Sequence, residues 1–320
     1  MDIRIVINGI LNLSLVFLIM PKFIEYLKKL SFKQSISEYA LEDDKKKAGT
    51  PIMGGILFII FPILTTLLIK PSIFKDLETI IVMIAFLGYG VIGFIDDYII
   101  SVKKNNDGLS PKKKLIMQFV LAALFFFIYR NSADLSIKFF LSRKVINLGI
   151  FYFILVIFMF AGSSNAVNLT DGMDGLASGV SIIALIPFLI ISLIQSKVNI
   201  AIFICGLIGA LLAYLYYNKK PAQVFMGDTG ALALGGVLAA LAMVTKTELV
   251  LILIAGVPVI ETLCVMLQIA AVKTIHRRIF TYTPIHYAFR IKGMPEKSIV
   301  YLFWMAEALF AVIGLLVALR

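Results

Sequence analysis

The sequence predicts an all-α polytopic membrane protein of about ten transmembrane helices, forming one domain over residues 1–320. Hydrophobic residues make up 60% of the chain and charged residues only 15%, and the mean hydropathy is +0.98. These values lie far from those of soluble globular proteins. Apolar stretches of about 17–22 residues recur along the chain, and that length crosses a hydrocarbon core roughly 30 Å thick. Lys and Arg collect in alternate connections between these stretches, as they do on the cytoplasmic side of membrane proteins.

The predicted spans lie near residues 3–20, 52–69, 80–95, 115–130, 148–163, 176–195, 200–217, 230–245, 249–270 and 299–319. The first has neither a basic flank before it nor a small-residue cleavage site after it, so we interpret it as a retained span and not as a signal peptide. In the ninth, Pro258 and Glu261 predict a bent helix that lines a lipid groove, whereas Glu307 in the tenth receives no role. Cys205 and Cys264 fall inside spans, which indicates neither a disulfide framework nor a thiolate metal site.

Basic residues set the predicted orientation. Most of the 30 Lys and Arg residues lie in loops at 22–51, 96–114, 218–229 and 271–298, which places these loops in the cytoplasm and both termini outside. Among the outer connections, 131–147 contains LSIKFFLSRKVINLG and predicts a small β-hairpin, with alternation on its second strand. We attribute most of the net charge of +11 to topology and to attraction for anionic membrane lipids. No nucleic-acid partner is expected.

Five aspartates lie at the predicted cytoplasmic ends of spans: Asp96 and Asp97 in GFIDDYI, Asp171 and Asp174 in NAVNLTDGMDGLA, and Asp228 in FMGDTGAL. A carboxylate at the edge of a bilayer is unfavourable unless it is paired, hydrated or bound to a metal, so these acids are functional candidates. Simpler interpretations exist for single residues. Asp228 could cap a helix, and Asp96 and Asp97 could begin a solvated loop. Three acidic edges among lysine-rich loops favour a shared site instead.

The stretch NAVNLTDGMDGLA spaces its polar side chains every three residues. Asn165, Asn168, Asp171 and Asp174 recur at this interval, so neighbours share a helical face while the ends of the series face apart. Neighbouring pairs can therefore share a ligand, but the whole row cannot. The two glycines in the stretch predict a broken helix, which is acceptable at membrane depth where the backbone lines a polar cavity. The alternative is that these side chains cap the sixth span.

Clustered carboxylates without cysteine and almost without histidine are hard oxygen ligands, which select Mg²⁺ or Mn²⁺. Mg²⁺ usually completes its coordination with phosphate oxygens of a substrate, so a phosphorylated substrate is predicted. Lys47 and the run Lys112–Lys114 supply cations for such a substrate. Gly49, Gly54 and Gly55 could let the backbone approach a ligand, although helix packing is the simpler explanation for them.

Six motifs follow one another along the chain: KKAGTPIMGG, FIDDY, GLSPKKKL, NAVNLTDGMDGL, FMGDTGAL and PIHYAFRIKGMPE. Together they resemble the signature set of the phospho-N-acetylmuramoyl-pentapeptide-transferase family, within the polyprenyl-phosphate sugar-1-phosphate transferases, over nearly the whole chain. The resemblance implies transfer of phospho-MurNAc-pentapeptide from UDP-MurNAc-pentapeptide to undecaprenyl phosphate, giving lipid I and UMP in the first membrane step of peptidoglycan synthesis. It also implies a homodimer in the bacterial cytoplasmic (inner) membrane, with the active site on the cytoplasmic face.

The resemblance further implies roles for individual residues. Asp228 is the expected Mg²⁺ ligand, with Mn²⁺ as a substitute, and Asp97, with Asp96 beside it, is expected to act on the lipid phosphate. The sequence leaves open whether Asp97 deprotonates that phosphate or attacks as a nucleophile. We favour direct attack by the lipid phosphate, which is already ionised near neutral pH. Lys114 and His286 complete the expected catalytic set. Among the expected substrate-binding residues, Phe225 is expected to stack on uracil, with Asp174 and Lys47 close by. Thr50, Asn168 and Asp171 are expected on the sugar side of the donor, and Asn218 is a further expected site residue.

One motif departs from the family pattern. The family usually shows three consecutive histidines after Pro-Ile, whereas this chain has His286, Tyr287 and Ala288, so a role that needs the second or third histidine does not carry over. The other histidine, His276, lies in the basic run KTIHRR, and we interpret it as a contact with solvent or lipid head groups. Phe225 could instead be an ordinary aromatic residue at a membrane interface.

Two other functions fit parts of the sequence. A related transferase that uses UDP-GlcNAc would share the carboxylates, and only the loop 271–298 argues against it. A secondary transporter would hold its ionisable residues near the bilayer midplane, whereas the acids here gather at one face.

Overall fold

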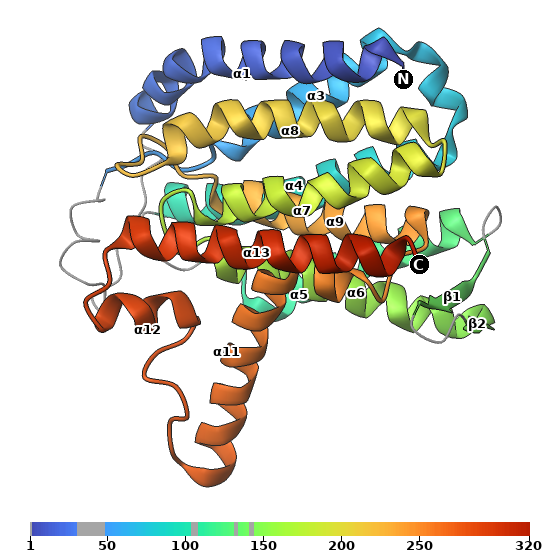
Figure 1. The fold of residues 1–320 in the computed structure, drawn as a ribbon. Helices are drawn as coiled ribbons and strands as arrows, with labels where there is room; N and C mark the ends of the chain where they lie inside the picture. Colours follow the sequence, from blue (N-terminus) through green and yellow to red (C-terminus); the bar gives the residue numbers. More distant parts are fainter. Residues whose placement is uncertain (1, 31–48, 104–107, 131–133, 141–143) are drawn as a thin grey trace.

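The structure is a computed structural model that describes residues 2–30, 49–103, 108–130, 134–140 and 144–320. Helices dominate it (Figure 1). Its elements are α1 (Ile3–Lys29), α3 (Gly55–Ile69), α4 (Leu77–Lys103), α5 (Pro111–Tyr129), β1 (Ser136–Phe139), β2 (Lys144–Asn147), α6 (Tyr152–Thr170), α7 (Leu176–Ile194), α8 (Val198–Asn218), α9 (Gly227–Thr245), α10 (Leu251–Ile254), α11 (Gly256–Ile275), α12 (Ile285–Ile291) and α13 (Glu296–Ala318). Short 3₁₀ helices lie at Pro71–Lys75 and Gly149–Phe151.

Eight helices in the described part of the chain are long and apolar enough to cross a membrane, namely α1, α4, α6, α7, α8, α9, α11 and α13. The other two predicted spans coincide with α3, which has 15 residues, and with α5, whose 19 residues begin with Pro and three lysines. The predicted all-α polytopic membrane protein is therefore confirmed. The number of ten spans and the outer location of both termini remain predictions.

Helix α9 is surrounded by other helices, and 89% of an apolar stretch of 18 residues within it is buried. Its sequence is apolar on every side, which is typical of a helix inside a bundle. Small residues let its neighbours approach closely. A Cβ on Gly235 would lie 2.3 Å from the carbonyl oxygen of Ser163 on α6, and a Cβ on Gly236 would lie 2.7 Å from the ring of Tyr89 on α4. This packing fixes the middle of α9 between α4 and α6.

The predicted ninth span is broken at Ala255 into α10 and α11, and α11 leaves the bundle (Figure 1). Pro258 lies in the first turn of α11, where its missing N–H removes no helical hydrogen bond. The N–H of Val257 donates instead to Glu307 Oε2 at 2.8 Å. A bend is thus present in this span, although it lies at Ala255 and not at Pro258, and the predicted lipid groove remains a prediction. Glu307, which had no role from the sequence, holds the start of α11 to α13.

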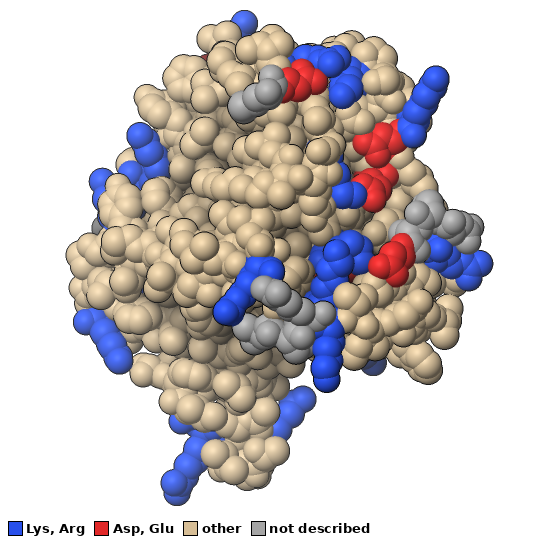
Figure 2. Space-filling model, turned by 45° about the vertical axis from the view of Figure 1, so that its right-hand side comes forward, with Lys and Arg blue, Asp and Glu red and all other residues tan. Residues whose placement is uncertain are grey.

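Apolar side chains cover much of the outside of the bundle. On α11, Leu263, Met266 and Leu267 are at least half exposed, as expected for residues that face lipid. Figure 2 shows broad areas without charge, with Lys and Arg at the margins and at the tip of the protruding α11. His276 lies in this tip as the exposed residue that ends α11, in agreement with its interpretation as a contact with solvent or head groups.

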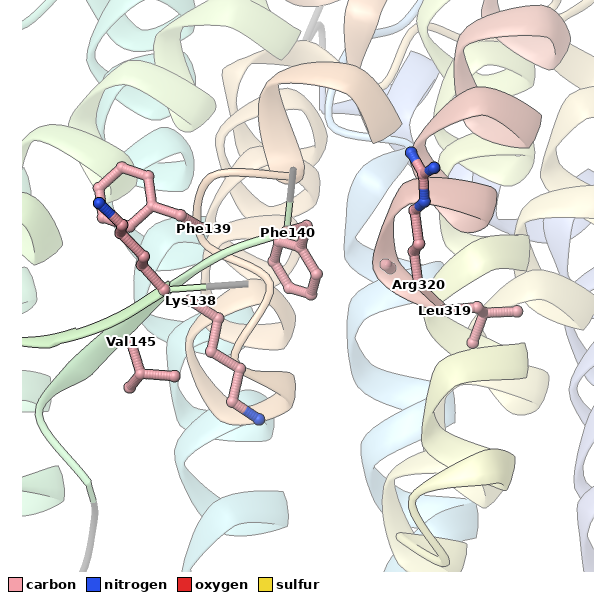
Figure 3. Close-up of a pocket in the computed structure, with 8 residues that line it drawn as sticks. Lys138, Phe139, Phe140, Val145, Leu319 and Arg320 are labelled. Carbon is pink, nitrogen blue, oxygen red and sulfur yellow. The ribbon is translucent and has the colours of Figure 1, made fainter. Parts of the chain in front are cut away.

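The β-hairpin predicted within 131–147 is confirmed by the strands β1 and β2. They pair antiparallel, with Ser136 opposite Asn147 and Phe139 opposite Lys144. All four residues of β2 are exposed, so the alternation in this strand produces no buried face. A pocket between the hairpin and the end of α13 is lined by Lys138, Phe139, Phe140, Lys144, Val145, Ala318, Leu319 and Arg320 (Figure 3). This pocket lies at the opposite end of the bundle from Asp96 and Asp228. Helices α5 and α9 both begin near these aspartates and run toward the hairpin (Figure 1).

Candidate active site

Glycines bring α4 against the start of α9. A Cβ on Gly93 would lie only 2.0 Å from the carbonyl oxygen of Asp228, so a larger residue would push the two helices apart. Gly227 begins α9 with a φ of 69°, in the left-handed region that favours glycine. A Cβ there would meet Asp97 Oδ2 at 2.3 Å. The glycines of GFIDDY and FMGDTG thus place Asp97 of α4 beside the first turn of α9.

Asp97 caps α9 with both carboxylate oxygens. Its Oδ1 accepts a hydrogen bond from the backbone N–H of Asp228 at 3.1 Å, and its Oδ2 accepts from the backbone N–H of Thr229 at 2.9 Å and from the Thr229 hydroxyl at 2.6 Å. A carboxylate is favourable here because a helix N-terminus has unpaired N–H groups and partial positive charge. We expected Asp96 and Asp97 to close a span, but α4 continues to Lys103. Both aspartates are buried, so the alternative of a solvated loop is wrong.

Lys114 joins two of the carboxylates. Its ammonium lies 2.9 Å from Asp96 Oδ2 and also contacts Asp228 Oδ2. The lysine is in the first turn of α5, which begins at Pro111, a residue that suits the first helical position. Just before that helix, the backbone N–H of Leu109 donates to Asp96 Oδ1 at 2.5 Å. The motif GLSPKKKL therefore supplies both a cation and a backbone donor to the aspartates.

Asp228 is the most accessible aspartate of this group. Its side chain is 22% exposed, against 5% for Asp96, while Asp97 is buried. Asn168 Nδ2 donates to Asp228 Oδ1 at 2.6 Å, which ties the end of α6 to the start of α9. A ligand that approaches from solvent therefore meets Asp228 and Lys114 first.

The stretch NAVNLTDGMDGLA contains a break between two helices. Helix α6 ends at Thr170 with Asp171 as its C-cap residue, and α7 begins at Leu176. Gly175 has a φ of 80°, which requires the conformational freedom of glycine. The broken helix predicted from the two glycines is thus confirmed. We call residues 171–175 the signature loop.

The row of polar side chains in this stretch divides among different neighbours. Asn165 Nδ2 donates to Gln118 Oε1 on α5 at 2.8 Å, and Asn168 binds the aspartate on α9. Asp174 Oδ2 accepts from the backbone N–H of Ala222 at 3.1 Å. The ends of the row serve different parts of the molecule. Because α6 ends at Thr170, however, Asp171 and Asp174 lie outside the helix, and the loop rather than the helical spacing sets their directions.

Asn218, the last residue of α8, uses its amide on the surrounding main chain. Its Oδ1 accepts from the N–H of Gly175 at 3.1 Å and from the hydroxyl of Ser178 at 2.9 Å, and its Nδ2 donates to the carbonyl of Val224 at 3.0 Å. Asn218 therefore fixes the signature loop against the segment that precedes α9.

Phe225 lies in that segment and is half-buried. Its N–H donates to the carbonyl of Pro51 at 2.9 Å, and its carbonyl accepts from the N–H of Gly54 at 2.8 Å. Thr50 directly precedes this pairing, so the structure brings Thr50 and Phe225 into one region. Lys47 lies outside the described residues.

His286 lies in α12 and is fully buried. Its Nδ1 lies 2.9 Å from Glu261 Oε1. Its Nε2 faces the signature loop, because a Cβ on Gly172 would lie 2.2 Å from that nitrogen. The hydroxyl of Tyr287 donates to the carbonyl of Gly172 at 3.0 Å. His286 and Tyr287 therefore both contact the signature loop.

Sequence reasoning missed three residues that hold the site together: Thr229, Glu261 and Glu296. Glu296 Oε1 accepts from the N–H of Asp174 at 3.1 Å, and its Oε2 contacts the ammonium of Lys220. Thr229 and Glu296 both belong to motifs that the sequence displays. Glu261 gave a different signal, an acid inside a span, which by itself marks a functional candidate.

The predicted site residues fall into three sets. One set is in direct contact and contains Asp96, Asp97, Lys114, Asn168 and Asp228. A second set meets at the signature loop and contains Asp171, Asp174, Asn218 and His286. The third set lies before the first turns of α3 and α9 and contains Thr50 and Phe225.

The direct-contact set suits a divalent cation. Among the residues that the structure describes, no group of three or more His, Cys, Asp or Glu side chains forms a complete metal site. Mg²⁺ is usually held by one or two carboxylates together with phosphate oxygens of a substrate. Asp228, accessible and next to Asp96 across one ammonium, offers that kind of incomplete, oxygen-only donor set.

Comparison with known proteins agrees with this arrangement. Residues 79–246 match the family model for glycosyl transferase family 4. The chain is 42% identical over 313 residues to the phospho-N-acetylmuramoyl-pentapeptide-transferase of Geobacillus kaustophilus, with 97% of each chain covered. It is 45% identical over 303 residues to the protein of that name from Bacillus subtilis and 46% identical over 302 residues to that from Bacillus pumilus, with 93% of each chain covered. The chain therefore belongs to the phospho-N-acetylmuramoyl-pentapeptide-transferase family, within glycosyl transferase family 4.

Proposed function

We propose that the protein transfers phospho-MurNAc-pentapeptide from UDP-MurNAc-pentapeptide to undecaprenyl phosphate, forming lipid I and UMP in peptidoglycan synthesis. The observation that carries the proposal is the pair of carboxylates, Asp96 and Asp228, around the ammonium of Lys114 at the first turn of α9. The relatives named above are, by name, transferases of phospho-N-acetylmuramoyl-pentapeptide, and they match almost the whole chain.

The reaction joins two anions. An oxygen of the lipid phosphate forms a bond to the sugar-bearing phosphorus of the donor, and the bond from that phosphorus to the bridging oxygen breaks, so that UMP leaves. Phosphoryl transfer of this kind depends mainly on positioning and on compensation of charge. Lys114 supplies a fixed positive charge beside the accessible Asp228, and Asn168 keeps that carboxylate oriented.

Mg²⁺ is the cofactor we propose, with Asp228 as its protein ligand and Mn²⁺ as a substitute. When bound, the ion compensates negative charge on the phosphate groups and holds them in position. Asp228 suits this role because its side chain is the accessible one, whereas Asp96 is almost enclosed by Lys114 and Leu109.

Asp97 is already fully engaged by α9. Both of its oxygens accept hydrogen bonds, from Asp228 and Thr229. A carboxylate in this state is a poor nucleophile, which supports direct attack by the lipid phosphate over a covalent intermediate on Asp97. In this account Asp97 acts on the lipid phosphate indirectly, by placing Asp228 and the first turn of α9.

We place donor recognition at the signature loop and the segment before α9. Phe225 is proposed to stack on uracil, with Asp174 and Lys47 close to the base. Thr50, Asn168 and Asp171 are proposed for the sugar side, and Asn218 for holding the two segments together. The support is that one set of backbone and amide contacts connects these segments.

The protein is a multi-pass membrane protein. We further propose that it lies in the bacterial cytoplasmic (inner) membrane, with the aspartates on the cytoplasmic face, and that it forms a homodimer. The supports are the basic loops at the aspartate end and the family resemblance. Native mass spectrometry of the detergent-solubilised protein tests the dimer, and a purely monomeric spectrum would contradict it.

Release of UMP from purified protein tests the function. We expect release with UDP-MurNAc-pentapeptide, only in the presence of undecaprenyl phosphate and Mg²⁺. UDP-GlcNAc is the comparison donor, because the related GlcNAc transferases share the carboxylates. Release with UDP-GlcNAc but not with UDP-MurNAc-pentapeptide would refute the proposal and assign the chain to the GlcNAc transferase activity.

A further inference from the structure

We propose that Glu261 is a positioning residue for His286: it keeps a hydrogen on Nδ1 and so directs Nε2 of the imidazole toward the signature loop. The kinetic part of this inference rests on the proposed function, because it concerns the transferase reaction. The place of the hydrogen is a property of the resting protein and can be measured without turnover.

The contacts of Glu261 define which imidazole nitrogen is occupied. Oε2 accepts from the backbone N–H of Ile285 at 2.6 Å, and Oε1 accepts from the backbone N–H of His286 at 3.2 Å. The imidazole Nδ1 lies 2.9 Å from the same Oε1. An ionised carboxylate can only accept hydrogen bonds, so Nδ1 is the donor in this contact. Both side chains are completely buried, which leaves no water to replace either partner.

The other imidazole nitrogen has no such partner. Nε2 of His286 is buried and makes no hydrogen bond to any residue that the structure describes. It points at Gly172, where only a residue without a side chain leaves room, since a Cβ would lie 2.2 Å away. Buried polar atoms are nearly always paired, and an exception facing the loop that carries Asp171 and Asp174 marks an atom available to a ligand.

The surroundings keep the imidazole in this orientation. The ring of Tyr287 packs on the imidazole with 4.3 Å between ring centres, and its hydroxyl binds the carbonyl of Gly172. Glu261 is itself held in place, because α11 is attached to α13 at its first turn by Glu307. A carboxylate that binds one nitrogen of a histidine in this way fixes the tautomer and the ring orientation, which leaves the other nitrogen for chemistry.

Nitrogen-15 solid-state NMR of the protein in lipid bilayers tests the inference directly. The chain has only two histidines, so His276→Asn leaves His286 as the single labelled imidazole. His276 is exposed and has a φ of 52°, a conformation that asparagine tolerates. In this background we expect a protonated Nδ1. A spectrum with Nδ1 unprotonated would overturn the inference.

Two buried glutamates allow a matched comparison. Glu261→Met removes both acceptor oxygens and keeps a side chain of similar size, so nothing holds the hydrogen on Nδ1 and we expect it to move to Nε2. Glu261→Asp keeps the carboxylate and should keep Nδ1 protonated. Glu307→Met removes an equally buried carboxylate that does not touch His286, and it should leave the imidazole spectrum unchanged. An unchanged spectrum in folded Glu261→Met protein would overturn the inference, and the parent spectrum decides if that variant does not fold.

Kinetics separate this inference from the proposed function. We expect Glu261→Met to lower kcat for UMP release about tenfold, and to have almost no further effect in a His286→Ala background. A purely structural role would instead add to the His286→Ala loss. A parent protein with protonated Nδ1 but no UMP release would refute the proposed function and support the placement of the hydrogen. Normal release of UMP by a protein with an unprotonated Nδ1 would support the proposed function and refute the placement of the hydrogen.

Discussion

Helix α9 has buried charged groups at both of its ends, and the two groups differ in balance. At the end beside the hairpin, Lys246 Nζ lies 2.9 Å from Glu248 Oε1, and the hydroxyl of Tyr152 donates to the same oxygen at 2.5 Å. Lys246 also donates to the backbone carbonyl of Asp134, just before β1. One cation here meets one carboxylate. We call this group the hairpin-end pair.

The other end of α9 is not balanced. Asp96, Asp97 and Asp228 lie together, and Lys114 is the one cation that contacts them within the described residues. A buried ion pair whose charges balance can serve structure alone, whereas an excess of carboxylates near a membrane edge needs further compensation. An excess of carboxylates over cations, more than burial, therefore distinguishes the candidate active site from a structural ion pair.

The largest expected effect follows from removing the accessible carboxylate at the unbalanced end. Asp228→Asn should lower kcat for UMP release by at least about a thousandfold, because an amide lacks the charge to hold a metal beside two phosphates. Removal of divalent ions with EDTA should abolish release by the unaltered protein, and Mg²⁺ or Mn²⁺ should restore it. Full turnover in EDTA would show that the excess of carboxylates serves something other than a metal.

Asp97→Asn should have the next largest effect, about a hundredfold on kcat, with the affinity for the UDP-sugar nearly unchanged. Asparagine keeps one acceptor oxygen for the first turn of α9 but places an NH₂ group where the second oxygen accepts, so the loss includes one cap contact as well as the charge. Thr229→Val is the control, because it removes one hydrogen bond to Asp97 without touching its charge. Isothermal calorimetry and UMP release measure the two quantities. Equal losses of binding and rate would make Asp97 a structural or donor-binding residue.

The parts of the fold that the sequence predicts are those set by local patterns. The spans follow from hydrophobicity, and the break before α7 follows from two glycines. Gly175 has a positive φ, and at Gly172 there is no room for a side chain. The hairpin follows from short alternating stretches between turns. In each case a run of neighbouring residues carries the information, so no knowledge of distant contacts is needed.

The parts that could not be predicted depend on residues far apart in the chain. Asp97 caps α9 across more than a hundred residues of sequence, and this contact exists only because Gly93 lets two helices approach. The pairing of Glu261 with His286 likewise requires α11 to leave the bundle and α12 to return to it. The position of the acids at the ends of apolar spans predicted them as candidates, but only helix packing selects their partners.

A smaller effect is expected where the chain departs from the triple-histidine pattern. His286→Ala should lower kcat at least about tenfold, the scale of one polar contact to a charged group. Tyr287→Ala and Ala288→Ser should each cost much less, because Tyr287 contributes a hydroxyl contact to the backbone of Gly172 and Ala288 is a small buried residue. Steady-state rates are to be compared among variants with matched melting temperatures in detergent. If Tyr287→Ala is the worst and His286→Ala is silent, the segment acts only as a support for the loop.

The smallest effect on turnover is expected at the hairpin-end pair. Glu248→Gln leaves Lys246 without its carboxylate in a buried position, and losing one partner of a buried ion pair costs about 3–5 kcal/mol. We therefore expect a lower melting temperature in detergent. The kcat of the folded protein should stay within about twofold of the parent, because α9 separates the pair from the aspartates by its 19 residues, roughly 28 Å at 1.5 Å per residue. Lys246→Met in the same variant should recover part of the lost stability, since it removes the unpaired cation. A fall in kcat comparable to that of Asp228→Asn would mean that the two ends are coupled through α9, and charge balance would then not separate structure from function in this molecule.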